Sequence, residues 1–317
     1  MKALTLSLLA GTAMLLARPL HRVPFEGLAA ELDTVLGGER ATFNWRLGAI
    51  SYRVIGAGEP LVLLHGINAA ASSYEMRRNF SELAAHFRVY APDLLGFGLS
   101  DRPRLRYTAG TYEELLASFL REVVRAPAHV VASSSSSAAA IAVAHASPDL
   151  VKSLVLICPT GIEKLSEVPT IARRVAGACI GLPVLGRRLF AGLVTRPSIR
   201  YFLRSMTYDR PDQISTEMVD LLHRLGQRSG SRWAPGAFLS GRLNRNIGDQ
   251  LAQLRQPMLL VWGKNATTTP LADAPAFLER NPRASLKVFD HAKLLPHDEQ
   301  AEAFNPFVHN WIKEHSA

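Results

Sequence analysis

The sequence predicts an α/β fold: a mostly parallel eight-stranded sheet with helices on both faces and a helical cap inserted after the sixth strand. Two observations support this prediction. Short apolar runs, typical of buried parallel strands, alternate along the chain with stretches of helical composition. One arginine- and proline-rich segment without a strand pattern, residues 162–250, interrupts the alternation. The predicted core therefore comprises residues 41–161 and 251–317, and residues 162–250 form a basic helical cap.

The predicted elements follow in chain order. Residues 43–47 and 50–54 alternate in polarity around Gly48 and predict a β-hairpin. Residues 61–64 are the first apolar run of the parallel type. The remaining predicted strands are 89–91, the run around Val130, 153–158, 257–263 and 285–289. The predicted core helices are 72–86, 111–125, the alanine-rich segment after Ser137, 271–280 and 299–314.

Five consecutive serines, Ser133 to Ser137, join the Val130 strand to the alanine-rich helix. A strand that turns sharply into a helix on small residues is one way to present a nucleophile. The central residue of such a turn has a strained positive φ, so its neighbours must be small. The alternative is an ordinary helix start, since serine is a good N-cap.

Composition limits the classes of function. The chain has 317 residues, 48% of them hydrophobic, and a net charge of +9. Its two cysteines, Cys158 and Cys179, predict neither a disulfide framework nor a metal site, and we expect no cofactor. Residues 161–250 hold 14 Lys and Arg against 7 Asp and Glu, which is +7 of the net charge. The arginines alternate with apolar residues and no nucleic-acid motif occurs, so an anionic membrane or amphiphile is favoured over nucleic acid, with a solvated charged face as the alternative.

The amino-terminal segment is apolar from residue 4 to 17, between Lys2 and Arg18. It is shorter than the roughly 20 residues that span a bilayer. It resembles the apolar part of a signal peptide, but Leu15 stands where the cleavage site needs a small residue. We predict that residues 1–22 associate with a membrane without being cleaved. A cleaved signal and a helix packed on the body are the alternatives, so membrane association or export is expected over a soluble cytoplasmic location.

Several short motifs stand at the ends of the predicted strands. They are His65-Gly66, Asp93-x-x-Gly96-x-Gly98-x-Ser100-x-x-Pro103, Leu154-Val155-Leu156-x-x-Pro159, Val261-Trp262-Gly263 and Pro296-His297-x-Glu299. In this order, and with the serine turn, they resemble the α/β-hydrolase-fold superfamily over residues 43–314. His65, Asp93 and Ser100 are interpreted as architecture of the loops.

The resemblance implies a serine nucleophile, a histidine base and an acid that orients the histidine. In this family the helix after the turn usually ends at a proline about fourteen residues past the nucleophile, and counting back from Pro148 gives Ser134. The resemblance also implies an oxyanion hole formed by the backbone N–H groups of Ile67 and Ser135, with Asn68 close by.

The other two triad positions depart from the family pattern. The acid position is Ala266 and the histidine position is Leu294, and neither side chain can transfer a proton. His297 is our preferred substitute base, although family members often carry a structural histidine there; His291 is the second choice. Acids near strand ends that could take part are Glu163, Asp273, Asp298 and Glu299.

Three functions remain open. The first is a serine hydrolase of the esterase or lipase type that acts through Ser134 on an apolar or amphipathic, lipid-like ester. The second is a catalytically impaired descendant that binds an apolar ligand, a membrane or a partner protein, because a serine without a base is a poor nucleophile. The third is an enzyme such as a lyase that uses the oxyanion hole without an acyl-enzyme.

Overall fold

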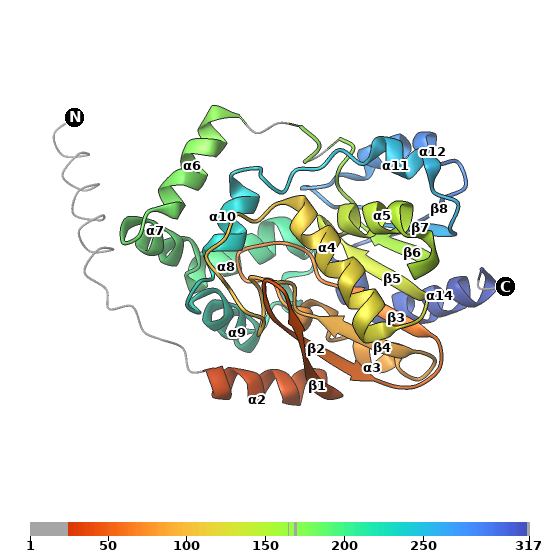
Figure 1. Cartoon of the computed structure of the whole chain (residues 1–317), viewed down its shortest axis with the longest axis horizontal. Helices are drawn as coiled ribbons and strands as arrows, with labels where there is room; N and C mark the ends of the chain where they lie inside the picture. Colours follow the sequence, from red (N-terminus) through yellow and green to blue (C-terminus); the bar gives the residue numbers. More distant parts are fainter. Residues whose placement is uncertain (1–24, 164, 168–169, 316–317) are drawn as a thin grey trace.

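The computed structural model describes residues 25–163, 165–167 and 170–315 (Figure 1). An eight-stranded sheet crosses its centre in the order β1-β2-β4-β3-β5-β6-β7-β8. The strands are β1 (Glu39–Trp45), β2 (Gly48–Ile55), β3 (Pro60–Leu64), β4 (Arg88–Pro92), β5 (Ala128–Ser133), β6 (Val151–Ile157), β7 (Met258–Gly263) and β8 (Ser285–Phe289). Only the pairs β1–β2 and β2–β4 are antiparallel. The predicted mostly parallel sheet is confirmed, whereas the prediction for residues 1–22 lies outside the described residues.

Alternation along the central strands builds two separate core layers. Val130 and Ala132 of β5 belong to one layer, while Val131 between them belongs to the other. Successive strand side chains point to opposite faces, so a continuous apolar run supplies both layers. The helices α4 (Ala109–Phe119), α5 (Ser136–Ala146), α11 (Gly248–Gln253) and α12 (Ala274–Arg280) cover one face. The short helix α3 (Phe80–Leu83) and the long α14 (Ala301–Glu314) cover the other (Figure 1).

One predicted helix is divided in the structure, and one observed helix was not predicted. The stretch 72–86 is divided into the 3₁₀ turn η1 (Ser73–Met76) and α3. Side chains of this stretch reach other parts of the chain: Glu75 bonds to Gly66, and Asn79 bonds to the carbonyl of His297. The amphipathic helix α2 (Phe25–Leu36) was not predicted; its leucines pack against α9 (Thr216–Gly226).

The segment between β6 and β7 contains only helices among its described residues. They are α6 (Ile171–Gly181), α7 (Leu185–Leu193), α8 (Arg196–Phe202), α9 and α10 (Trp233–Leu239), with short turns between them, and α11 follows before β7. We call α6 to α10 the inserted helices. They have an apolar cluster of their own, which includes Phe190, Ile199 and Met218, and Leu295 from the core joins it. This cluster forms one wall of the cavity described next.

Candidate active site

Ser134 occupies the sharp turn between β5 and α5. Its φ is +51°, a strained conformation that costs of order 1–3 kcal/mol in a residue with a side chain. The Ser134 N–H donates to the carbonyl of Ile157 at 2.8 Å, and the Ser134 carbonyl accepts from Ser137 N at 3.0 Å. The Ser136 hydroxyl donates to the carbonyl of His65 at 2.6 Å and ties the start of α5 to the end of β3. The serine run therefore forms the strained turn expected for a nucleophile.

The loop after β3 lies directly beside this turn. A Cβ atom added to Gly66 would lie 3.3 Å from Ser133 Oγ and 3.5 Å from Ser134 Cβ. A side chain at position 66 would therefore crowd the serine turn. Asn68 accepts from the N–H of Ala70 at 2.9 Å and shapes the loop. Within the described part of the chain, the N–H groups of Ile67 and Ser135 have no hydrogen-bond acceptor. Two unpaired donors beside a strained serine are what an oxyanion hole requires.

The residues His65 and Asp93, interpreted above as parts of the loop architecture, hold the loops in place by hydrogen bonds. The His65 ring accepts from the N–H of Leu94 at 3.0 Å, and burial lowers the pKa of His65. The Asp93 carboxylate accepts from the N–H groups of Ser73 and Leu99 at 2.6 and 2.7 Å. These contacts fix the loops around the serine turn, and Asp93 is not part of the cavity lining.

A cavity of about 680 Å³ lies between the serine turn and the inserted helices. Its size is within the range of small-molecule sites. Ser133, Ser134, Glu75 and Asn68 lie on its polar side near the serine turn, and other polar lining residues include Glu163, Arg173 and Asn244. Its apolar lining includes Phe190, Leu193, Ile199, Phe202, Leu203 and Leu222. No described histidine lines it. The cavity is thus suited to an apolar molecule with one polar group near Ser134.

Glu75 is an acid that lies beside this turn, and the sequence analysis did not single it out. Both of its carboxyl oxygens lie 3.1 Å from the Gly66 nitrogen, and its side chain is only 8% exposed. A Cβ atom added to Gly66 would lie 3.4 Å from Glu75 Oε2 and 3.5 Å from Ser134 Cβ. Glu75 and Ser134 therefore both lie next to the same glycine. Burial raises the pKa of Glu75 to about 7, although the nearby Ser133 hydroxyl and the hydrogen bond from the Gly66 N–H oppose the shift. A carboxyl group that titrates near neutral pH can accept and return a proton.

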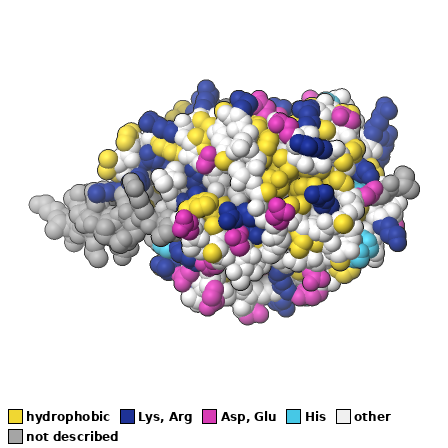
Figure 2. Space-filling model, turned by 60° about the horizontal axis from the view of Figure 1, so that its bottom comes forward, with side chains coloured by type: hydrophobic (Ala, Val, Ile, Leu, Met, Phe, Trp, Pro, Cys, Tyr) yellow, Lys and Arg dark blue, Asp and Glu magenta, His cyan; other side chains and the backbone are white. Residues whose placement is uncertain are grey.

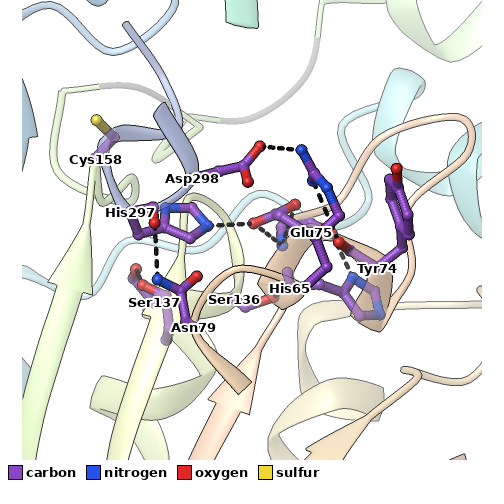
Figure 3. A network of polar contacts seen from close by, with 12 residues as sticks. His65, Tyr74, Glu75, Asn79, Ser136, Ser137, Cys158, His297 and Asp298 are labelled. Atoms are coloured by element: carbon purple, nitrogen blue, oxygen red, sulfur yellow. Dashed lines mark hydrogen bonds and ion pairs between the residues drawn. The ribbon is translucent and has the colours of Figure 1, made fainter. Parts of the chain in front are cut away.

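His297, our preferred base, lies on α13 (Pro296–Glu299) and is fully buried. Its Nε2 is 3.7 Å from Glu75 Oε1, and Asn79 donates to its backbone carbonyl at 2.7 Å (Figure 3). Burial, followed by the charge of Arg77, lowers the pKa of His297 to about 3. The ring is therefore neutral at physiological pH and contacts Glu75 from outside the cavity lining. Its role as a base stays a prediction.

A buried ion pair closes the site next to Glu75. Arg77 donates to Asp298 Oδ2 at 2.8 Å, and the Tyr208 hydroxyl donates to the same oxygen. Although burial opposes its charged form, Asp298 raises the pKa of Arg77. The guanidinium carbon also lies 4.6 Å from the centre of the Tyr74 ring. Arg77 lines the cavity, but its charge is already neutralised.

The positions of the missing triad residues are occupied by apolar side chains. Leu294 lines the cavity and packs against both the core and the inserted helices. Ala266 is buried after β7. The second-choice base, His291, is exposed and does not line the cavity. Of the other suggested acids, Glu299 accepts from the N–H groups of Lys293 and Asp209, and only Glu163 lines the cavity.

The eight-stranded, mostly parallel sheet has a strained serine at the end of a central strand, and this serine faces a cavity beneath the inserted helices. This arrangement is typical of the α/β-hydrolase fold. Residues 61–307 match the family model described as the alpha/beta hydrolase family. The chain therefore belongs to the α/β-hydrolase family.

Three relatives illustrate the similarity. A 2-hydroxy-6-oxononadienedioate/2-hydroxy-6-oxononatrienedioate hydrolase of Pseudomonas putida is 27% identical over 276 residues, which cover 83% of this chain and 91% of that protein. A 2-hydroxy-6-oxo-2,4-heptadienoate hydrolase of Pseudomonas putida is 25% identical over 267 residues, covering 81% of this chain and 90% of its own. The crystal structure of a serine hydrolase involved in carbazole degradation superposes with a TM-score of 0.73 at 21% identity, covering 87% of this chain and 98% of that one.

Proposed function

We propose that this chain is a hydrolase that attacks the carbonyl group of an apolar or amphipathic ester with Ser134. The observation that carries the proposal is the strained Ser134 at φ +51°, which lines an apolar cavity beside two unpaired backbone N–H groups. A strained non-glycine residue persists only where the surrounding structure maintains it, and such strain is concentrated at functional sites.

Glu75 is the proposed proton acceptor in this reaction. Ser134 Oγ forms a bond to the ester carbonyl carbon while its proton passes to the Glu75 carboxylate. The N–H groups of Ile67 and Ser135 stabilise the resulting oxyanion. The bond to the leaving alkoxide then breaks, and Glu75 returns the proton to that oxygen. A water molecule repeats the same sequence on the acyl-enzyme, which releases the acid and restores Ser134.

The charge of the lining favours an uncharged acyl group. The two named relatives hydrolyse 2-hydroxy-6-oxo acids, which carry carboxylates. An anionic substrate needs a free cation in the cavity. Here Arg77 is paired with Asp298, and Arg173 donates to the carbonyls of Phe238 and Leu239. These neutral carbonyls leave the charge of Arg173 uncompensated, but Glu75, Glu163 and Glu167 also line the cavity, so an apolar ester fits the site better than a dicarboxylate.

A second candidate is a binding protein for the same apolar molecules. Leu294 and Ala266 stand at the family's histidine and acid positions, and no described histidine lines the cavity. This function would need the cavity but not the hydroxyl of Ser134.

One experiment separates the two candidates. The purified chain is treated with a fluorophosphonate probe and assayed on nitrophenyl esters of increasing acyl length. We expect labelling and turnover in the wild type and neither in Ser134→Ala. An unlabelled, inactive wild type that still binds an apolar fluorescent probe, with equal affinity in Ser134→Ala, would establish the binding protein instead.

A further inference from the structure

The outer surface of α6 and α7 is apolar and uncovered in the described structure. Ile171 is 79% exposed, Val184 67%, Val175 56% and Leu193 54%. Three more large apolar side chains of this surface are about half exposed: Leu182, Leu185 and Leu189. These seven side chains form what we call the α6–α7 face. Single exposed apolar residues are common, but contiguous ones mark an interaction surface.

The inner side of the same two helices is already packed. A Cβ added to Gly177 of α6 would lie 2.2 Å from Ser240 Cβ, so the helix backbone lies directly against the segment after α10. Ile180 and Phe190 are buried in the cluster of the inserted helices. The pair is thus apolar on its buried side and on its outer side as well. A helix that is apolar all round is normally covered on every side.

Every charged side chain within the stretch of sequence that holds the α6–α7 face is basic. From residue 168 to 208 the sequence has seven arginines and no Asp or Glu. Arg174 and Arg187 are exposed, and neither pairs with a described acid. After burial, the charges of Arg104 and Arg187 lower the pKa of Arg232, which shows how closely these cations gather. At the upper left of Figure 2, basic side chains lie among apolar ones.

The shape of the pair excludes a straight passage through a bilayer. Within the described residues, no single helix has the length and apolar composition of a membrane span. Arg173–Gly181 and Leu185–Leu193 meet that description only together, and they are bent by 113°. Short apolar helices flanked by arginines are typical of segments that lie in the plane of the membrane interface.

The cavity opens toward the same side of the molecule. Leu193 belongs both to the α6–α7 face and to the cavity lining. Leu239 and Met206, which are 39% and 37% exposed, also line the cavity. The α6–α7 face and the cavity that contains Ser134 therefore adjoin each other at Leu193.

We propose that the α6–α7 face docks on the surface of an anionic lipid bilayer, with its apolar side chains in the interface and its arginines on the lipid phosphates. The partner is a lipid surface because the face combines apolar side chains with the exposed Arg174 and Arg187, within a stretch of 41 residues that contains no acid. The proposal does not depend on Ser134, and it holds for an enzyme and for a binding protein alike.

The test is vesicle flotation of the full chain. Vesicles of phosphatidylcholine with and without phosphatidylglycerol are compared. We expect Arg174→Gln with Arg187→Gln to weaken binding to the anionic vesicles by about fivefold for each arginine. The matched control is Arg283→Gln, a change near β8, at the opposite end of the molecule in Figure 1, which should bind as the wild type does. Equal binding of wild type and double variant to anionic vesicles would overturn the role of the arginines.

A second measurement separates this face from any contribution of residues 1–22. Val184→Trp is compared with Leu286→Trp, a similar change at a 38% exposed site on β8. With brominated phospholipids in anionic vesicles, we expect added tryptophan fluorescence to be quenched in Val184→Trp and not in Leu286→Trp. Binding without quenching in Val184→Trp would mean that another segment contacts the lipid, and it would overturn the proposal.

Discussion

The carboxyl ends of the parallel strands form two groups, which depart from the family pattern to different extents. At β3 and β5 the loop after Gly66 and the turn at Ser134 keep the backbone geometry of a nucleophile and its oxyanion donors. At β7 and β8 the side chains that would move the proton are replaced by Ala266 and Leu294. The contrast teaches that the backbone of a site can persist while the side chains at its proton-transfer positions change, and we propose that Glu75 takes over the proton transfer here.

The largest expected effect concerns the retained half. Ser134→Ala should lower kcat on a nitrophenyl ester by at least about a thousandfold, since removal of a nucleophile leaves only the oxyanion hole and binding. Steady-state kinetics and fluorophosphonate labelling measure it. Ser147→Ala, at the far end of α5, is the matched control and should remain active. Full activity in Ser134→Ala would show that the serine turn does not supply the nucleophile.

The next effect concerns the proton acceptor. Glu75→Gln should lower kcat by about a hundredfold or more, the usual contribution of a general base. Because the base must be ionised and its pKa is raised to about 7, wild-type activity should rise with pH through that value, and the variant should lose this limb. Glu82→Gln, an exposed acid on α3, is the control. An unchanged pH profile in Glu75→Gln would mean that another group accepts the proton.

Stability gives a second readout for Glu75. Its folded pKa, about 7, lies above the ordinary 4.5, so the contribution of Glu75 to stability is complete below pH 4.5 and is lost as the pH rises through 7. Glu75→Gln should therefore lose less stability than the wild type between these values. Urea unfolding at several pH values would measure this, and parallel curves for both proteins would contradict it.

A smaller effect is expected when the altered half is returned to the family pattern. Leu294→His with Ala266→Asp puts an imidazole at the cavity wall and an acid behind it. We expect a gain in kcat of about tenfold in the presence of Glu75, and a partial rescue of Glu75→Gln. Leu294→His alone serves as the control for simple repacking. A double variant that folds but does not rescue Glu75→Gln would show that these positions no longer face Ser134 productively.

The smallest effect on turnover is expected for His297→Ala. Since the ring is buried beside Glu75, we expect a loss of roughly 2 kcal/mol in unfolding free energy at neutral pH and only a modest change in kcat. The lowered pKa of His297, about 3 against 6.5 unfolded, also makes wild-type stability fall as the pH drops from 6.5 toward 3, and the variant should lose that dependence. A loss of activity as large as in Ser134→Ala would identify His297 as the base.

Local patterns in the sequence determined the sheet and the strained serine turn. Apolar runs such as Leu61–Leu64 and the run around Val130 must fill both faces of a parallel sheet, and they pair directly in the structure. Small residues around Ser134 permitted the positive φ that is observed. Ala266 and Leu294 were identified as departures from the same motifs. These features depend on neighbours in the chain, so the sequence alone determined them.

Only the tertiary structure decided which group stands beside the serine. Glu75 follows the end of β3 by eleven residues and gains its environment from Gly66, Ser133 and His297, which come from three other segments. The motif around His297 suggested that this residue is a base. The burial of its ring and its contact with Glu75, however, follow from the packing of α13 against η1. Burial and long-range contacts set proton affinity, and neither can be deduced from local sequence.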